Sequence, residues 1–169
     1  MTYAVDSNII IDILIDDQEY APRAVEALIR ASRDGNLIAC DVVWAEASSH
    51  FTDKVQFRKV MSDFGITFSA MSDSAAIKAG ELWNNSRRED KRREKTARTA
   101  ITPDFMVGAH ALEFADALIT RDRGFLRKWF KTLKIIDPSK PTDSEFVPLG
   151  AYVTTPVGET PTRIGAKRK

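Results

Sequence analysis

The chain has 169 residues, of which 43% are hydrophobic and 29% charged, so it is long enough for one domain with a sizeable core. Its 25 basic and 24 acidic residues leave a formal net charge of +1, so only local clusters of charge can indicate a nucleic-acid partner. Cys40 is the only cysteine, which excludes an internal disulfide and favours a small core residue. The sequence shows no signal peptide and no apolar run near 18 residues, so we expect a cytoplasmic protein without membrane association.

The first predicted elements are a strand and two helices. The apolar residues at about 3–5 predict a buried strand, and Ser7 or Asn8 can cap the short Ile-rich helix that follows. A longer helix begins near Pro22, a residue suited to the first helical turn, and ends at Gly35.

A second strand over about 37–40 leads into a helix that carries an acidic residue. Asp41 is expected to cap this helix, which runs from Val42 to about Phe51. Glu46 lies three and four residues beyond the apolar pair at 42 and 43, so its carboxylate shares their inward face.

The middle of the chain predicts a helix, a brief strand over 66–68 and a further helix. The first helix ends at Gly65, and its predicted inner face consists of Val55, Val60, Met61 and Phe64. The second begins near Ser72 and continues through a basic stretch to Arg98. Cations recur there at helical spacing, which fits either a solvated face or a phosphate-binding stripe with Arg88, Arg92 and Lys95 as RNA contacts.

Two acidic residues follow in the last third of the predicted domain. Thr102 and Pro103 are a good helix start, and Asp104 in the first turn would gain roughly 0.3 to 1 kcal/mol from the helix dipole even without another function. A strand over about 117–120 then ends just before Asp122. A short helix over 126–130 and a last strand over 133–136 complete the domain.

The alternation of strands and helices predicts an α/β fold with three α/β/α layers and a mainly parallel central sheet. In such sheets ligands bind at the carboxyl ends of the strands, where this pattern places Asp6 and Asp122. We therefore expect Asp6, Glu46, Asp104 and Asp122 to form one acidic site. Four carboxylates in one crevice repel each other, and a divalent cation is the natural compensation.

The residue types of this site indicate which metal and which reaction to expect. Carboxylates without His or Cys favour hard ions, so we expect Mg²⁺, with Mn²⁺ able to replace it. Such an ion activates a water for attack on a phosphodiester and neutralises charge on the phosphoryl oxygens. The sequence has no Gly-rich phosphate loop, nucleophile elbow or paired-Cys zinc spacing that would favour another reaction.

Four motifs follow one another over about residues 1 to 138: Asp6-Ser7-Asn8 after a strand, Glu46 on a helix, Pro103-Asp104 opening a helix and Thr120-Arg121-Asp122 after a strand. In this order they resemble the PIN-domain ribonucleases, in particular the VapC-like toxins of type II toxin–antitoxin pairs. The resemblance implies a Mg²⁺-dependent endoribonuclease with Asp6 and Asp104 as principal metal ligands and Glu46 and Asp122 completing the catalytic site. It also implies that Asn8 and Thr120 are supporting residues, that a small cognate antitoxin binds the protein, and that the protein forms a homodimer.

Two alternatives stay open beside this interpretation. The acidic crevice could hold a metal or a partner's Arg without turnover, as in a non-catalytic RNA- or protein-binding module. The same metal chemistry could also act on DNA, since no sequence feature reports contacts to the 2′-hydroxyl. Residues 139–169 are rich in Pro and Thr, and we expect them to form a flexible C-terminal tail.

Overall fold

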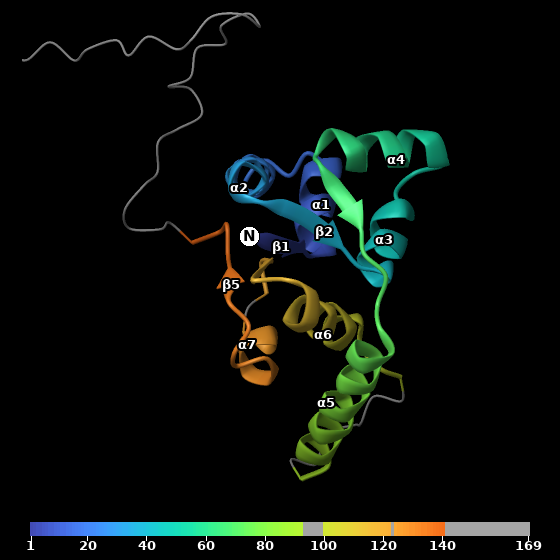
Figure 1. The fold of residues 1–169 in the computed structure, drawn as a ribbon, viewed down its shortest axis with the longest axis vertical. Helices are drawn as coiled ribbons and strands as arrows, with labels where there is room; N and C mark the ends of the chain where they lie inside the picture. Colours follow the sequence, from blue (N-terminus) through green and yellow to red (C-terminus); the bar gives the residue numbers. More distant parts are fainter. Residues whose placement is uncertain (93–99, 123, 141–169) are drawn as a thin grey trace, which may run out of the picture.

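A computed structural model of the protein describes residues 1–92, 100–122 and 124–140 (Figure 1). Five strands in this part of the chain form one parallel sheet with the order β3-β2-β1-β4-β5. In chain order the strands are β1 (Thr2–Val5), β2 (Asn36–Ala39), β3 (Ile66–Phe68), β4 (Ala117–Ile119) and β5 (Ile135–Ile136). The predicted α/β class with a parallel sheet is confirmed.

Helices cover both faces of this sheet. They are α1 (Ser7–Leu14), α2 (Ala21–Asp34), α3 (Asp41–Ser48), α4 (Lys54–Asp63), α5 (Asp73–Arg92), α6 (Pro103–Phe114) and α7 (Phe125–Trp129). Figure 1 shows α1 and α2 on one side of the sheet and α6 on the other, with α5 packed beside α6 and extending away from the domain. None of the described helices is both long and apolar enough to cross a membrane.

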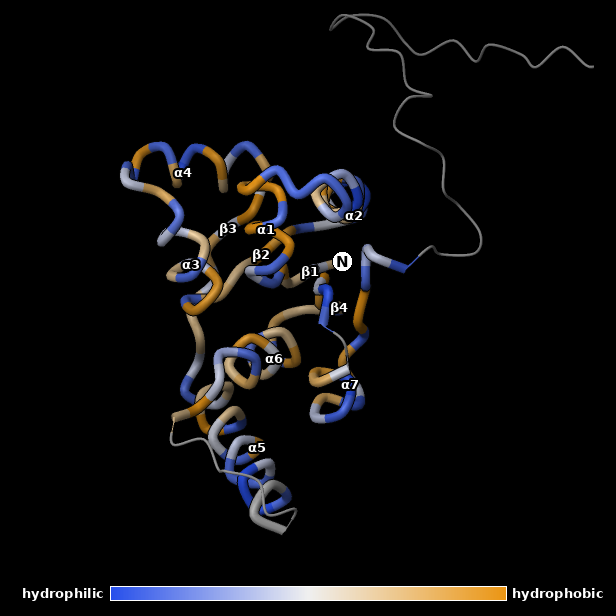
Figure 2. The backbone as a smooth tube through the Cα atoms, turned by 180° about the vertical axis from the view of Figure 1, so that it is seen from behind, coloured by the Kyte–Doolittle hydropathy of each residue, from blue (hydrophilic) through white to orange (hydrophobic). Residues whose placement is uncertain are grey.

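Helix α6 has more buried residues than any other described helix, namely Phe105, Val107, Gly108, Ala109, His110 and Ala111. It packs against β1 and β4, and its tube in Figure 2 has the colours of apolar residues along much of its length. Gly108 lies so close to the buried ring of Phe130 that an added Cβ would be 2.3 Å from a ring carbon. His110 is also buried, and its Nε2 lies 2.9 Å from the hydroxyl of Ser69.

The inner face of α4 differs from the prediction. Val55 is 74% exposed, whereas Phe57 and Met61 are buried. The helix begins at Lys54, so Val55 lies in its first turn on the solvent side, and the two buried residues are four positions apart on the opposite side. Apolar residues alone therefore did not identify the buried face.

Two predicted helix caps were wrong, and both errors concern residues near the carboxyl edge of the sheet. Helix α1 is capped by Asp6, whose carboxylate accepts a hydrogen bond from the N–H of Ser7. Helix α3 follows Cys40 without a side-chain cap, because the carboxylate of Asp41 accepts the N–H of Met71 instead. Cys40 itself is buried and free, as predicted. The predicted continuation of α5 to residue 98 and the tail beyond residue 140 lie outside the described residues.

Candidate active site

The centre of the candidate site is the edge where β1 and β4 end. Val5 pairs with Ile119 in the parallel register, so the next residues, Asp6 and Thr120, lie side by side. The backbone N–H of Asp6 continues the ladder by donating to the carbonyl of Ile119 at 3.0 Å. The sheet geometry therefore brings together two residues that are 114 positions apart in the sequence.

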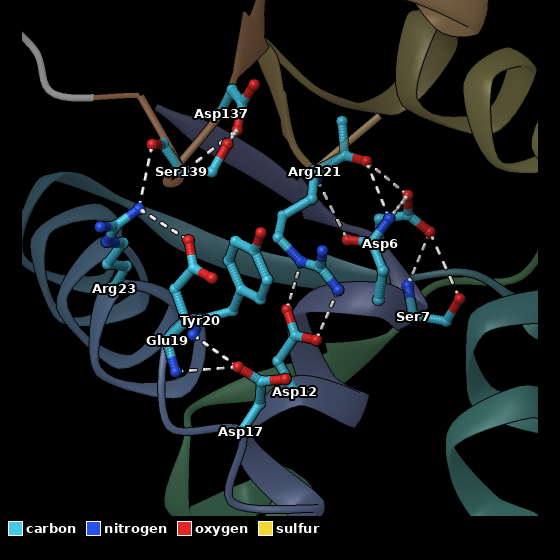
Figure 3. Close-up of polar contacts among 12 residues, drawn as sticks. Asp6, Ser7, Asp12, Asp17, Glu19, Tyr20, Arg23, Arg121, Asp137 and Ser139 are labelled. Carbon is cyan, nitrogen blue, oxygen red and sulfur yellow. Dashed lines mark hydrogen bonds and ion pairs between the residues drawn. The ribbon is translucent and has the colours of Figure 1, made fainter. Parts of the chain in front are cut away.

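The Asp6 carboxylate is held on both oxygens (Figure 3). Its Oδ2 accepts the side-chain amide of Asn8 at 2.7 Å and the hydroxyl of Thr120 at 2.6 Å, and its Oδ1 accepts the N–H of Ser7 at 2.7 Å. Only 7% of Asp6 is exposed. Its orientation is therefore fixed by neighbours on α1 and on the loop after β4.

The electrostatics of Asp6 connect it to two further acidic residues. Burial raises the pKa of Asp6 from 3.8 to about 6, although the hydrogen bonds from Thr120 and Ser7 oppose this change. The negative charges of Asp104 and Glu46 contribute to this raised pKa. Asp104 and Glu46 thus both lie within electrostatic reach of Asp6.

These two neighbours differ from Asp6 in exposure. Glu46 is half-buried on α3, and Asp104 is exposed in the first turn of α6. The buried acid is therefore rigidly held at the base of the site, while Asp104 is accessible to solvent and to a bound substrate.

Asp122 has a different environment from the other three acids. Its carboxylate accepts the backbone N–H groups of Gly124, Phe125 and Leu126 at the start of α7. Its own N–H donates to the hydroxyl of Thr120 at 3.0 Å. The structure therefore connects Asp122 to the site through Thr120, while its carboxylate oxygens bind the start of α7.

A cleft opens beside the acidic residues, between α1 and α3. It has a volume of about 500 Å³ and includes Ser7, Asn8 and Glu46 together with Ser49, His50 and Arg121. The cleft is large enough for a ligand of nucleotide size. It therefore provides an approach to the acidic site from the side of α1 and α3.

An ion pair on the wall of this cleft was not predicted from the sequence. Asp12 on α1 is only 3% exposed, and Arg121 binds it through two hydrogen bonds of 2.5 and 2.6 Å. The guanidinium carbon of Arg121 lies 4.1 Å from the centre of the Tyr20 ring. The sequence feature that could have indicated this pair is Asp12 itself, a carboxylate within the apolar run 9–13, because a buried acid requires a partner.

The donors at this edge suit a hard divalent cation, since they are carboxylate and amide oxygens. Within the described part of the chain, no group of three or more His, Cys, Asp or Glu side chains could hold a metal ion by itself. Mg²⁺ commonly keeps several waters and uses one or two carboxylates together with a substrate phosphate. The residues present therefore fit an ion that is only partly coordinated by protein.

The predicted RNA-binding residues lie on α5 or beyond the described region. Arg88 is exposed on α5, whereas the side chain of Arg92 and all of Lys95 lie outside the described residues. The carboxylate of Glu89 accepts the ammonium of Lys128 at 2.7 Å, which connects α5 to α7. This contact fixes the position of α5 beside the short helix that Asp122 caps.

The fold is a parallel α/β domain with acidic residues near the carboxyl edge of its sheet. The PIN domain family matches residues 3–131, and the chain belongs to this family. No curated protein sequence matches the chain.

Solved structures with a similar fold include several VapBC proteins. VapBC-1 from nontypeable Haemophilus influenzae is 19% identical, with a TM-score of 0.57, and the match covers 83% of this chain and 100% of that one. DNA-bound VapBC from Salmonella typhimurium is 16% identical, with a TM-score of 0.55 and coverage of 82% and 98%. VapBC2 from Rickettsia felis, bound to a DNA fragment from its promoter, is 20% identical, with a TM-score of 0.54 and coverage of 81% and 98%. At these identities the likeness shows a shared fold.

Proposed function

We propose that the protein is a Mg²⁺-dependent endoribonuclease that hydrolyses RNA phosphodiester bonds. The observation that supports this most is the buried Asp6, whose pKa is raised in part by the charges of Asp104 and Glu46. Carboxylates that repel one another at the carboxyl edge of a parallel sheet are suited to a divalent cation. Mn²⁺ should replace Mg²⁺ because both accept oxygen ligands.

In this proposal Asp6, Glu46 and Asp104 hold the ion, and Asp122 contributes through the hydroxyl of Thr120. A bound ion would make a water a better nucleophile and would neutralise charge on the phosphoryl oxygens. Asn8 and Thr120 orient the Asp6 carboxylate by donating hydrogen bonds to it, and Asp104 is exposed on the side where the substrate would bind. The cleft beside Glu46 would accept a nucleotide next to the scissile phosphate.

The first test is cleavage of a pool of structured RNAs and a DNA control with Mg²⁺, with Mn²⁺ and with EDTA. Asp104→Asn should abolish cleavage and leave the fold intact, because Asn has the same shape and can still accept a hydrogen bond at the helix start. Asp73→Asn is a matched control, since Asp73 lies in the first turn of α5 and the adjacent Ser72 contacts Glu113 at the other end of α6.

Each outcome of this test has a definite meaning. RNA cleavage that requires metal and is lost only in Asp104→Asn supports the proposal. Cleavage of DNA alone would assign the same chemistry to another substrate. Metal binding without cleavage of either nucleic acid would support the binding module instead.

We propose that Arg88, which is exposed on α5, binds the RNA backbone together with Arg92 and Lys95. Neutralising Arg88, Arg92 and Lys95 together should flatten the salt dependence of RNA affinity, because fewer counterions are released on binding. The control is the equivalent triple variant of Lys54, Arg58 and Lys59, which are exposed on α4. An equal salt slope in the wild type and the α5 variant would exclude these residues as RNA contacts.

We also propose that a small antitoxin controls this activity and that the protein forms a homodimer in the cytoplasm. The similar solved structures are VapBC complexes, which supports a protein partner for this fold. Expression of the chain alone should therefore inhibit growth, and Asp6→Ala should remove the inhibition. Growth inhibition that persists in Asp6→Ala would separate toxicity from the acidic site.

A further inference from the structure

We propose that Asp12 and Arg121 act as a positioning pair for the acidic site. By fixing the loop after β4 to α1, they keep Asn8 and Thr120 in contact with the Asp6 carboxylate. The effect on metal binding rests on the proposed function, whereas the effect on the loop does not.

The pair has a geometry that restricts movement. Nε and one terminal nitrogen of Arg121 donate to the two oxygens of Asp12 at 2.5 and 2.6 Å, so the pair is bidentate (Figure 3). The ring of Tyr20 lies under the guanidinium at 4.1 Å from its centre. Asp12 is almost completely buried, so its charge requires Arg121 in this position.

A continuous set of hydrogen bonds connects the pair to Asp6. The backbone N–H of Arg121 donates to Oδ1 of Asn8 at 3.2 Å. The amide of Asn8 in turn donates to Oδ2 of Asp6 at 2.7 Å and to Oγ1 of Thr120 at 3.1 Å. Asn8 and Thr120 therefore hold the candidate metal ligand Asp6 directly, and Arg121 holds Asn8.

Helix α1 binds the loop at two points on one face. Asn8 and Asp12 are four residues apart, so both side chains point toward the loop that follows β4. Asn8 holds the loop backbone and Asp12 holds the side chain of the same residue, Arg121. Loss of the second contact would leave Arg121 held to α1 only by the weaker neutral hydrogen bond from its N–H to Asn8.

Residues that orient a metal ligand through hydrogen bonds typically change metal affinity or activity by about 10- to 100-fold when they are replaced. Asp12→Asn and Arg121→Gln should therefore each weaken Mn²⁺ binding about tenfold. The double variant should be no weaker than either single variant, because the two residues act as one unit.

The experiment combines two measurements on the full chain. Mn²⁺ titration reports the metal affinity, and hydrogen exchange of Ala117–Asp122 in the metal-free protein reports the order of the loop. Exchange should be faster in both single variants. Asp63→Asn is the matched control, because it removes a carboxylate that binds Lys59 within α4 and should leave both readouts unchanged.

Three results would overturn the proposal. Equal Mn²⁺ affinity in wild type and variants would refute the positioning role, and unchanged loop exchange would refute its mechanism. Weaker RNA binding in Arg121→Gln, with normal metal affinity in Asp12→Asn, would make Arg121 a direct RNA contact instead. If the wild type binds no Mn²⁺, the proposed function fails, and loop exchange still decides whether the pair positions the loop.

Discussion

The raised pKa of Asp6 predicts that the metal-free protein loses stability as the pH rises. The perturbation is Asp6→Asn, which removes the titrating group and keeps the size of the side chain. The observable is the difference in the free energy of unfolding between the wild type and this variant across pH. Differences in hydrogen bonding between Asp and Asn add a constant offset, so only the change of this difference with pH carries information.

The sign and the size follow from the two pKa values. The pKa is 3.8 in the unfolded chain and about 6 in the folded protein. Below 3.8 both states are protonated. Between the two values the unfolded state releases its proton first, so the wild type loses stability as the pH rises. A difference of about two pK units corresponds to about 3 kcal/mol, and this loss is complete above pH 6.

The assay is urea unfolding followed by fluorescence of the three Trp residues between pH 4 and 7.5, with EDTA and then with Mg²⁺. With EDTA, the wild type should become less stable relative to Asp6→Asn by up to about 3 kcal/mol over this range. Saturating Mg²⁺ at pH 7 should recover part of this loss, because the ion binds the folded state. A pH-independent difference would show that Asp6 is not in the environment described above.

Three further predictions concern the packing and the helix that support the site. Gly108→Ala should destabilise the protein by about 1 to 3 kcal/mol through overpacking against Phe130, whereas Gly80→Ala, with no atom within 4 Å of the added Cβ, should be neutral or gain up to about 1 kcal/mol; urea midpoints measure both. Burial lowers the pKa of His110, so its contribution to stability should be lost as the pH falls through 6.5, and this pH dependence should be missing in His110→Asn. Asp122→Ala should cost about 1 to 2 kcal/mol because three backbone N–H groups at the start of α7 lose their acceptor; an unchanged midpoint would contradict the capping role.

The sequence predicted the α/β class, the parallel sheet and the approximate ends of the strands. Asp6 follows one short apolar run directly, and Asp122 follows another after Thr120 and Arg121, which predicted both at the carboxyl edge of the sheet. Parallel pairing of β1 with β4 places these two strand ends together. The position of Glu46 on the inward side of α3 followed from helical periodicity alone. These features could be predicted because each depends on a regular repeat within one element.

Contacts between elements could not be predicted in the same way. Asp6 rather than Ser7 caps α1. The Asp6 carboxylate is also bound by Thr120 after the neighbouring strand β4, a contact that no local sequence pattern indicates. Asp12 and Arg121 are 109 positions apart, and no local pattern indicates which of many acids and cations will pair. Asp122 matches the expected position, but its carboxylate binds a helix start that forms only after the turn at Gly124.

The division between a buried acid and an exposed one explains how this edge could bind an ion without a complete protein cage. Asp6 is held by neighbours on α1 and on the loop after β4, which restrict its orientation. Asp104 is exposed, so a phosphate can approach the same ion from the solvent side. An ion with water and phosphate among its ligands needs few protein carboxylates. Precise placement of those few then matters more than their number, and this is why an ion pair such as Asp12 and Arg121, which contacts no metal, should control metal affinity.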